Sequence, residues 1–260
     1  MNIVDITSRD NAFLKDLRRL AQDNTAYRKQ GRVWLEGDHL CRAYLARGGQ
    51  PAIAVFSEDE WLRSQAAYVG CAPRFVVVKT ALMREVSGLE SPASMGFVVD
   101  WPGTPALDLH APTVVLDRVQ DAGNVGAILR SAAAFGFTQV AALKGTAALW
   151  SSKVMRAGMG AHFGLRLVDG LALADIASLQ VPLLATSSHG GRHVHEGGLP
   201  FPCAWILGHE GQGVSAELEA LAREKVRIIQ PGGEESLNVA VAAGICLHAS
   251  AAGQWRPGHA

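Results

Sequence analysis

Residues 113–143 have the sequence TVVLDRVQDAGNVGAILRSAAAFGFTQVAAL, and this stretch decides the fold of the chain. Its first four residues predict a short buried strand, and residues 125–135 predict an alanine-rich helix that Gly136 ends. Residues 137–143 predict a second strand. Two strands joined by a helix are the unit from which parallel sheets are built. The stretch therefore predicts an α/β fold.

The same alternation continues to the end of the chain. The expected strands are residues 165–168, 183–185, 204–207 and 226–229, and the expected helices are residues 150–159, 215–222 and 237–250. Near-continuous apolar strands separated by helices indicate a mostly parallel sheet that is covered on both faces. Ligands of such sheets bind beyond the carboxyl ends of the strands, so we expect the functional site there.

A segment rich in proline and glycine divides the chain into two domains. Residues 100–112 contain three prolines and one glycine, which interrupt any periodic pattern and predict a linker. Before it, residues 1–99 predict a smaller α/β domain, and after it residues 113–260 form the larger one. The smaller domain is expected to have helices at 11–20 and 40–47 and strands at 33–35, 52–56, 75–78 and 96–99.

The composition of the 260 residues, 48% hydrophobic and 18% charged, is that of an ordinary folded protein. The four cysteines are far apart and form no CxxC pair, so neither a zinc ribbon nor a disulfide framework is predicted. The chain begins without a signal-peptide pattern, and its apolar run at 239–247 is too short to span a bilayer. We expect a cytoplasmic protein without a membrane partner.

The formal net charge is zero, but its distribution along the chain is uneven. Between Arg9 and Arg47 the sequence has nine basic residues against five acidic ones. The N-terminal region is therefore basic on a protein whose overall charge gives no support to a nucleic-acid partner.

Three segments that follow expected strands are rich in glycine, asparagine and charged residues. In residues 116–130, Asn124 can cap the helix, and Arg130 lies near the positive end of the helix dipole. A bound anion explains Arg130 better than the dipole does, although a surface ion pair stays open. Residues 206–214 contain three glycines within six residues, which bring backbone amides close to a ligand or simply make a tight turn. In residues 228–244, Ser236 and Asn238 open a helix of small residues. Capping alone explains Ser236, whereas Asn238 is expected inside a buried first turn.

Together these segments resemble the motifs of the SpoU/TrmH family of RNA ribose 2′-O-methyltransferases, in the SPOUT superfamily. The first is similar to the family's Asn-x-Gly-x-x-x-Arg, the second to its Gly-Asn-Glu-Gly loop at 208–211, and the third to its Ser-Leu-Asn-Val at 236–239. The resemblance covers residues 114–249 closely and residues 8–99 more loosely, where it suggests the family's substrate-binding domain. His209 departs from the pattern, because the family usually has asparagine there.

The resemblance implies a SPOUT α/β-knot with a deep trefoil knot, a bound S-adenosylmethionine (SAM), and a homodimer packed on the knot helices. It implies SAM-dependent methylation of a ribose 2′-hydroxyl in structured RNA, with rRNA preferred to tRNA and no metal. A free guanidinium is a poor base, so we expect Arg130 to grip the target phosphate and hydroxyl, with Glu210 able to hold Arg130. The implied catalytic residues are Arg130, Asn124, Glu210, Ser236 and Asn238; the cofactor-binding residues are Thr186, Gly208, Gly213, Ile228 and Leu237; and the RNA-binding residues are Arg9, Arg18, Arg19, Arg28 and Lys29.

Two other functions stay open from the sequence. One is a non-catalytic SPOUT protein that binds SAM or RNA, although the intact polar set argues against it. The other is a SPOUT methyltransferase that acts on a base instead of a ribose. A metal site made of His189, His193, His195 and Glu196 is disfavoured, because these residues lie in a glycine-rich segment that predicts a loop.

Overall fold

A computed structural model describes residues 2–86, 89, 91–232 and 236–253 of the chain. The chain forms two compact units. The first unit comprises Met1–Gly103 and Trp150–Phe163, and the second comprises Thr104–Leu149 and Gly164–Ala260. The segment Trp150–Phe163 therefore packs in the first unit, although it lies within the 113–260 range of the larger sequence-based domain.

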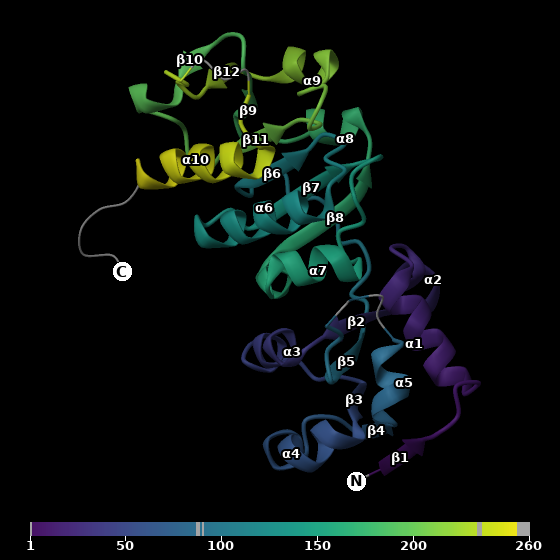
Figure 1. Ribbon diagram of the computed structural model, residues 1–260. Helices are drawn as coiled ribbons and strands as arrows, with labels where there is room; N and C mark the ends of the chain where they lie inside the picture. The colour runs from purple at the N-terminus through teal and green to yellow at the C-terminus, as the bar shows by residue number, and fades with distance from the viewer. Residues whose placement is uncertain (1, 87–88, 90, 233–235, 254–260) are drawn as a thin grey trace. The chain divides into compact units, whose positions relative to one another are not determined.

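The second unit is built on a seven-stranded sheet in the order β10-β12-β9-β11-β6-β7-β8 (Figure 1). Every pair of neighbouring strands is parallel, which confirms the expected parallel sheet. The strands are β6 (Thr113–Leu116), β7 (Gln139–Leu143), β8 (Arg166–Leu171), β9 (Leu183–Thr186), β10 (Arg192–His193), β11 (Ala204–Leu207) and β12 (Glu224–Arg227).

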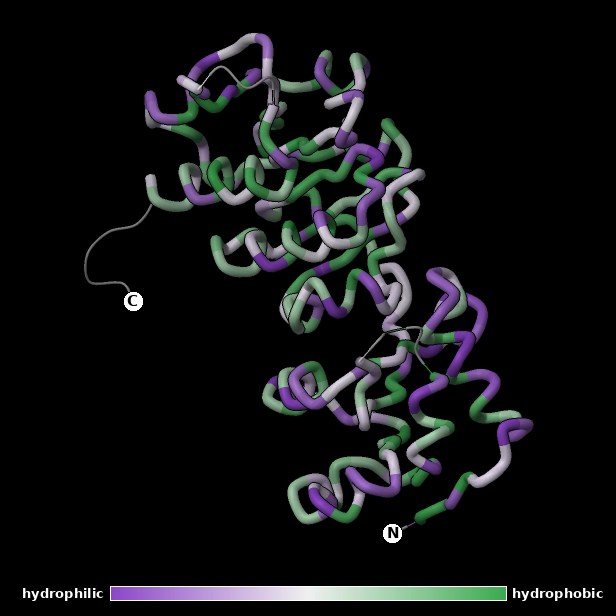
Figure 2. The backbone as a smooth tube through the Cα atoms, viewed as in Figure 1, coloured by the Kyte–Doolittle hydropathy of each residue, from purple (hydrophilic) through white to green (hydrophobic). Residues whose placement is uncertain are grey.

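Helices cover both faces of this sheet. Successive residues of a strand point to opposite faces, so two neighbouring residues of β11 show which helices lie on each side. Ile206 on β11 packs in a core cluster with Ile176 of α8 (Leu173–Ala177) and Leu218 of α9 (Ala216–Leu221). Its neighbour Trp205 points to the other face, where its indole Nε1 donates a hydrogen bond to Ser250 Oγ at 2.9 Å. Ser250 is on α10 (Val239–Ala252), which lies beside α6 (Ala122–Ala134). Figure 2 shows the hydrophobic strands running between these helical layers.

The helix expected at 125–135 begins three residues earlier than predicted. Asp121 is its N-cap, and the Asp121 side chain accepts a hydrogen bond from the backbone N–H of Asn124 at 2.8 Å. Asn124 was expected as the cap but lies inside the first turn, so its side chain is available for other partners. That difference matters for the site.

The first unit has a five-stranded mixed sheet in the order β1-β4-β3-β5-β2. The strands are β1 (Asn2–Ile6), β2 (Arg32–Glu36), β3 (Ile53–Ser57), β4 (Arg74–Val78) and β5 (Met95–Asp100). The helices are α1 (Ala12–Gln22), α2 (Ala26–Gln30), α3 (Asp38–Leu45), α4 (Glu58–Tyr68), α5 (Thr80–Arg84) and α7 (Ser152–Gly158). β1, α2, α4 and α5 were not expected from the sequence.

α7 is held in the first unit by buried polar contacts as well as apolar packing. Ser152 Oγ donates a hydrogen bond to the carbonyl of Leu20 at 3.0 Å. Arg156 forms an ion pair at 3.1 Å with the buried carboxylate of Glu36 on β2. A buried charge needs such a partner. These contacts hold α7 in the first unit, although the strands before and after it, β7 and β8, belong to the second unit.

None of the helices in the described residues combines the length and the apolar composition of a membrane span.

Candidate functional site

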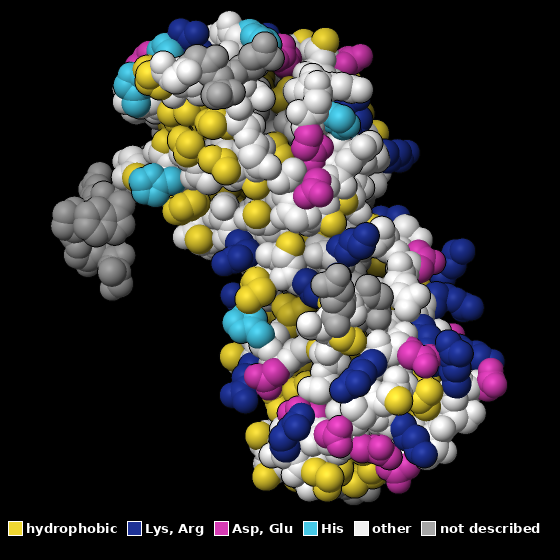
Figure 3. All heavy atoms as spheres, viewed as in Figure 1, with side chains coloured by type: hydrophobic (Ala, Val, Ile, Leu, Met, Phe, Trp, Pro, Cys, Tyr) yellow, Lys and Arg dark blue, Asp and Glu magenta, His cyan; other side chains and the backbone are white. Residues whose placement is uncertain are grey.

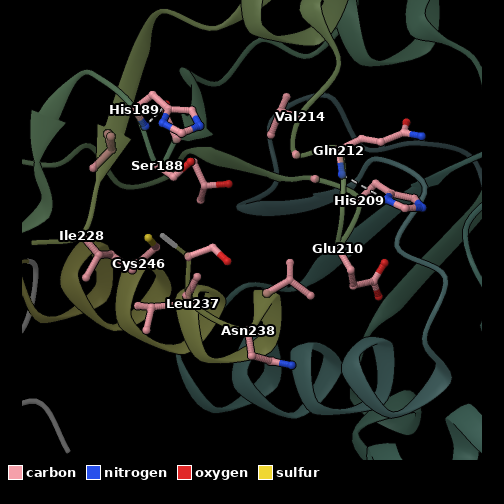
Figure 4. Close-up of a pocket in the computed structure, with 18 of the residues that line it drawn as sticks. Ser188, His189, His209, Glu210, Gln212, Val214, Ile228, Leu237, Asn238 and Cys246 are labelled. Atoms are coloured by element: carbon pink, nitrogen blue, oxygen red, sulfur yellow. Dashed lines mark hydrogen bonds between the residues drawn. The ribbon is translucent and has the colours of Figure 1, made fainter. Parts of the chain in front are cut away.

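A cavity of about 510 Å³ lies beyond the carboxyl ends of β9, β11 and β12, with the first turns of α10 as one wall (Figure 4). This is the edge of the sheet where the sequence placed the site. The five residues expected to bind a cofactor all line the cavity: Thr186, Gly208, Gly213, Ile228 and Leu237. The structure thus brings together residues from four separate segments.

The loop after β11 makes a tight turn that requires glycine at its start. A Cβ on Gly208 would lie 2.0 Å from the carbonyl carbon of Gly213, so no side chain fits there. The neck of the loop is closed by two backbone hydrogen bonds between His209 and Gly213, at 3.0 and 2.8 Å. The loop closed in this way lines the cavity along residues 208–214.

His209, the departure from the family pattern, stabilises this loop from within. Its Nδ1 accepts hydrogen bonds from the backbone N–H groups of Gly211 at 3.0 Å and Gln212 at 3.3 Å. An asparagine side-chain oxygen makes bonds of the same kind to following amides. The histidine consequently replaces the usual asparagine in a structural role, and its Nδ1 carries no proton in this arrangement.

The three motifs of the second unit meet through side-chain hydrogen bonds. Asn124 Nδ2 donates to Glu210 Oε1 at 3.1 Å, and Asn238 Nδ2 donates to Asn124 Oδ1 at 2.9 Å. Asn124 thus links the loop after β11 to the start of α10. Glu210 and Asn238 also line the cavity, so this network lies at its rim.

Glu210 is anchored as an anion. Its carboxylate accepts the backbone N–H of Asp121 at 3.0 Å and that of Gln120 at 3.1 Å, besides the Asn124 amide. Partial burial raises the pKa of Glu210, but these hydrogen bonds outweigh burial and lower the pKa to about 2. A carboxylate with such a low pKa is a hydrogen-bond acceptor and not a general base at neutral pH.

Asn238 and Ser236 open α10 in different ways. Asn238 is the N-cap, with Oδ1 accepting the backbone N–H groups of Ala240 at 2.9 Å and Val241 at 3.3 Å. Asn238 is exposed, so the expectation that it sits inside a buried first turn was wrong. Ser236 is also exposed and lines the cavity two residues earlier.

Arg130 is exposed on α6 and stands apart from this network. It lies about 9 Å along the helix from Asn124, since an α-helix rises 1.5 Å per residue. It forms no hydrogen bond or ion pair with any residue that the structure describes, and it does not line the cavity. Glu210, which the sequence offered as a partner for Arg130, instead binds Asn124 and two backbone amides.

The expected RNA-binding residues all lie in the first unit, but several are already paired. Arg9 and Arg18 share the carboxylate of Glu85, at 2.9 and 3.2 Å. Arg19 lies 3.6 Å from Asp16. Arg28 lies over the ring of Tyr27, and Lys29 is exposed. Figure 3 shows Lys and Arg interspersed with Asp and Glu on this unit, so its cationic surface is partly neutralised.

Several cavity residues escaped the sequence prediction: Ser187, Ser188, His189, Gln212, Val214 and Cys246. Most of these residues directly follow an expected strand or adjoin a motif glycine. Their position after a strand is the sequence feature that could have predicted them. His193 does not join the cavity; its Nε2 lies 2.8 Å from a guanidinium nitrogen of Arg227. Within the described part of the chain, no group of side chains has the composition of a metal site.

Comparison with known proteins shows to which family the chain belongs. The model of the SpoU rRNA Methylase family matches residues 111–248. A tRNA/rRNA methyltransferase of Synechocystis, named as uncharacterized, is 31% identical across 98% of this chain and 96% of its own length. A 23S rRNA (guanosine(2553)-2′-O)-methyltransferase of Bacillus subtilis is 28% identical across 94% of this chain and 97% of its own.

Solved structures agree with this result. The structure of an RNA 2′-O ribose methyltransferase has a TM-score of 0.79 and 28% identity, with 97% of this chain and 99% of that chain covered. An AdoMet-bound rRNA methyltransferase from Sinorhizobium meliloti has the same fold, with a TM-score of 0.84 and 24% identity over 98% of this chain and 99% of its own. The chain belongs to the SpoU rRNA methylase family.

Proposed function

We propose that this protein transfers a methyl group from SAM to a ribose 2′-hydroxyl of structured RNA, with rRNA preferred to tRNA. The observation that carries the proposal is the network of Glu210, Asn124 and Asn238 at the rim of the cavity. It joins three segments that are far apart in sequence and that match the three motifs of the family. The names of the Bacillus subtilis relative and of the 28% identical structure support ribose as the target.

The cavity fits SAM in size and chemistry. Its volume of about 510 Å³ is in the range of small-molecule sites. Gly208 lets the loop after β11 close tightly at the edge of the cavity, while Val214, Ile228 and Leu237 supply an apolar wall. When bound, the cofactor supplies a methyl group on a sulfonium centre. The residues that would hold it are those of the loop after β11 together with Thr186, Ile228 and Leu237.

The polar residues around the cavity would bind and orient the ribose. Glu210 stays ionised and fixes Asn124, which in turn fixes the amide of Asn238. Arg130 has no partner among the described residues, so its guanidinium is available for a phosphate and the target hydroxyl. Orienting the attacking oxygen is a large part of catalysis in a displacement of this kind.

A homodimer and a knot belong to the same proposal. Val241 and Ile245 on α10 are 52% and 37% exposed and lie four residues apart, so they form one apolar stripe. A second copy packed on α10 would cover this stripe. The last strand, β12, lies inside the sheet between β9 and β10, and α10 returns to α6, an arrangement that supports a knotted C-terminal segment. Sedimentation velocity of the full chain tests the dimer, and a monomer at micromolar concentration would contradict it.

The decisive experiment is transfer of tritiated methyl from SAM to total RNA from a strain that lacks this gene. The labelled RNA is separated into rRNA and tRNA, each fraction is digested to nucleosides, and the nucleosides are analysed. Label in a 2′-O-methylnucleoside of rRNA is the expected result, and label in tRNA would correct the substrate class. Label on a base would replace ribose by base methylation, and SAM binding without label would favour a non-catalytic protein.

A further inference from the structure

A buried carboxylate behind the cavity is tied to the loop that lines it. Asp117 follows β6 directly and is only 1% exposed. Its Oδ2 accepts the backbone N–H of Ser215 at 2.7 Å, and its Oδ1 accepts Nε–H of Arg118 at 2.8 Å. Burial raises the pKa of Asp117, but the hydrogen bonds from Arg118 and Ser215 lower it below its ordinary value. The carboxylate is therefore an ionised anchor for Ser215.

Arg118 reaches the same loop from a second point. Its terminal NH1 donates to Gln212 Oε1 at 3.2 Å, while its Nε and NH2 face the Asp117 carboxylate. Its backbone has a φ of 57°, in the left-handed region that residues other than glycine rarely adopt. Gly145 leaves room for its side chain, because a Cβ there would lie 3.2 Å from Arg118 Cγ. Such a conformation persists where the surrounding contacts fix it, often at functional sites.

The two attachment points lie on either side of two loop residues that line the cavity. Gln212 and Ser215 are separated by Gly213 and Val214, both of which line the cavity. Figure 4 shows the Gln212 side chain pointing away from the cavity. Asp117 and Arg118 thus hold the loop from outside, while His209 closes it across its own neck.

We infer that Asp117 and Arg118 are positioning residues for the methyl donor. They act through Ser215 and Gln212 and hold Gly213 and Val214 in the conformation that binds the donor. The inference rests on the proposed function, because it takes the cavity as the SAM site. Asp117 and Arg118 are not among the residues found to line the cavity, so their loss should weaken SAM binding without changing turnover of the bound complex.

The test uses Arg118→Ala, Arg118→Gly, Gln212→Ala and the double variant Arg118→Ala/Gln212→Ala, with Arg223→Ala as an exposed-arginine control. Calorimetry gives the Kd for SAM, methylation assays give KM and kcat, and thermal unfolding gives Tm. We expect Kd and KM for SAM to rise about tenfold in both Arg118 variants, the effect of one lost charged hydrogen bond. The kcat at saturating SAM should stay within about twofold, and the control should match the wild type.

Two comparisons separate positioning from simple stability. Glycine adopts a φ of 57° freely, so Arg118→Gly should have a higher Tm than Arg118→Ala while binding SAM equally weakly. Both single changes break the hydrogen bond between Arg118 and Gln212, and Arg118→Ala also loses the bonds to Asp117. The double variant should therefore bind SAM no more weakly than Arg118→Ala. SAM affinity that follows Tm across the variants would overturn the positioning role.

The failure of this role differs from the failure of the proposed function. If the wild type methylates RNA and Arg118→Ala binds SAM with unchanged Kd, the positioning role is wrong and the proposed function stands. If the wild type neither binds SAM nor methylates RNA, the proposed function is wrong and the role falls with it.

Discussion

The cations of the two units differ in whether a carboxylate of the protein already pairs with them. In the first unit, Arg9 and Arg18 share Glu85, so cations that could meet RNA phosphates are partly satisfied internally. In the second unit, Glu210 at the rim of the cavity is satisfied by amides, and Arg130, which lies on α6 outside the cavity lining, has no partner within the described chain. An anionic substrate gains most from a cation that has no ion pair to break. The comparison therefore places the largest functional effects at Arg130 and smaller ones in the first unit.

The largest effect is expected for Arg130→Ala. Turnover should fall about 10³-fold, the upper range for loss of one group that stabilises a reacting centre. The Kd for SAM should stay unchanged, because Arg130 does not line the cavity. Methylation rates and calorimetry check this, with Arg223→Ala as the control. An equal loss of SAM binding would move Arg130 from the ribose side to the cofactor side.

Two substitutions of Asn238 distinguish its role as helix cap from its role in the polar network. Asn238→Asp keeps an oxygen acceptor for the backbone N–H groups of Ala240 and Val241 but cannot donate to Asn124. We expect turnover to fall roughly tenfold or more with little change in Tm. Asn238→Ala should also lose the cap, which costs about 1 kcal/mol of stability. If Asn238→Asp keeps full turnover, the bond to Asn124 has no catalytic importance.

Substitutions of His209 test whether this departure from the family motif stabilises the loop in the way that asparagine would. His209→Asn should bind SAM within about twofold of the wild type, because asparagine can accept the same amide hydrogen bonds. His209→Ala should weaken SAM binding by roughly tenfold, since two loop amides lose their acceptor. Calorimetry with SAM gives both values. Equal binding by the alanine and asparagine variants would exclude this role for the ring.

A smaller effect is expected in the first unit, where paired and unpaired cations can be compared directly. Lys29 is exposed and forms no ion pair with the described residues, whereas Arg9 lies 2.9 Å from Glu85. Lys29→Ala should lower the salt dependence of RNA binding by about one counterion, and Arg9→Ala by less. Filter binding at several salt concentrations measures both slopes. Equal slopes would mean that the ion pair with Glu85 opens in the RNA complex.

The smallest effect is the acid titration of Glu210. Its pKa of about 2 in the folded protein lies below the ordinary value of 4.5. The stability contributed by its hydrogen bonds is therefore fully present above about pH 4.5 and is lost as the pH falls toward 2. Glu210→Gln should remove this part of the pH dependence in denaturant unfolding between pH 2 and 6. A loss of the Glu210 contribution near neutral pH would contradict the low pKa.

The sequence predicted the alternation of strands and helices well where the signals are local. The strands expected at 113–116 and 204–207 and the helix expected at 215–222 lie close to their predicted positions. β1 was missed because its partner, β4, is about seventy residues away. α4 had a usable signal, since Ser57 caps it and accepts the N–H of Glu60.

The residues of the site were predictable as a set but not in their contacts. Motif resemblance selected five residues that all line the cavity and three that form the network at its rim. It did not foresee that Asp121 would cap α6 or that Glu210 would bind backbone amides instead of Arg130. The Asp121 cap is a local contact, made three residues along the chain, whereas the hydrogen bonds of Glu210 and Asn238 join residues 86 to 114 positions apart.

By itself the sequence determined the α/β class, the parallel sheet and the edge at which the cavity forms. Apolar spacing, caps and glycines act within a few residues of the chain, so these features follow from local patterns. Only the tertiary structure decided which polar groups meet, which cations are neutralised and that α7 packs in the first unit. Such partners depend on how distant segments are brought together, because a buried donor, acceptor or charge is stabilised by whichever group the fold places beside it.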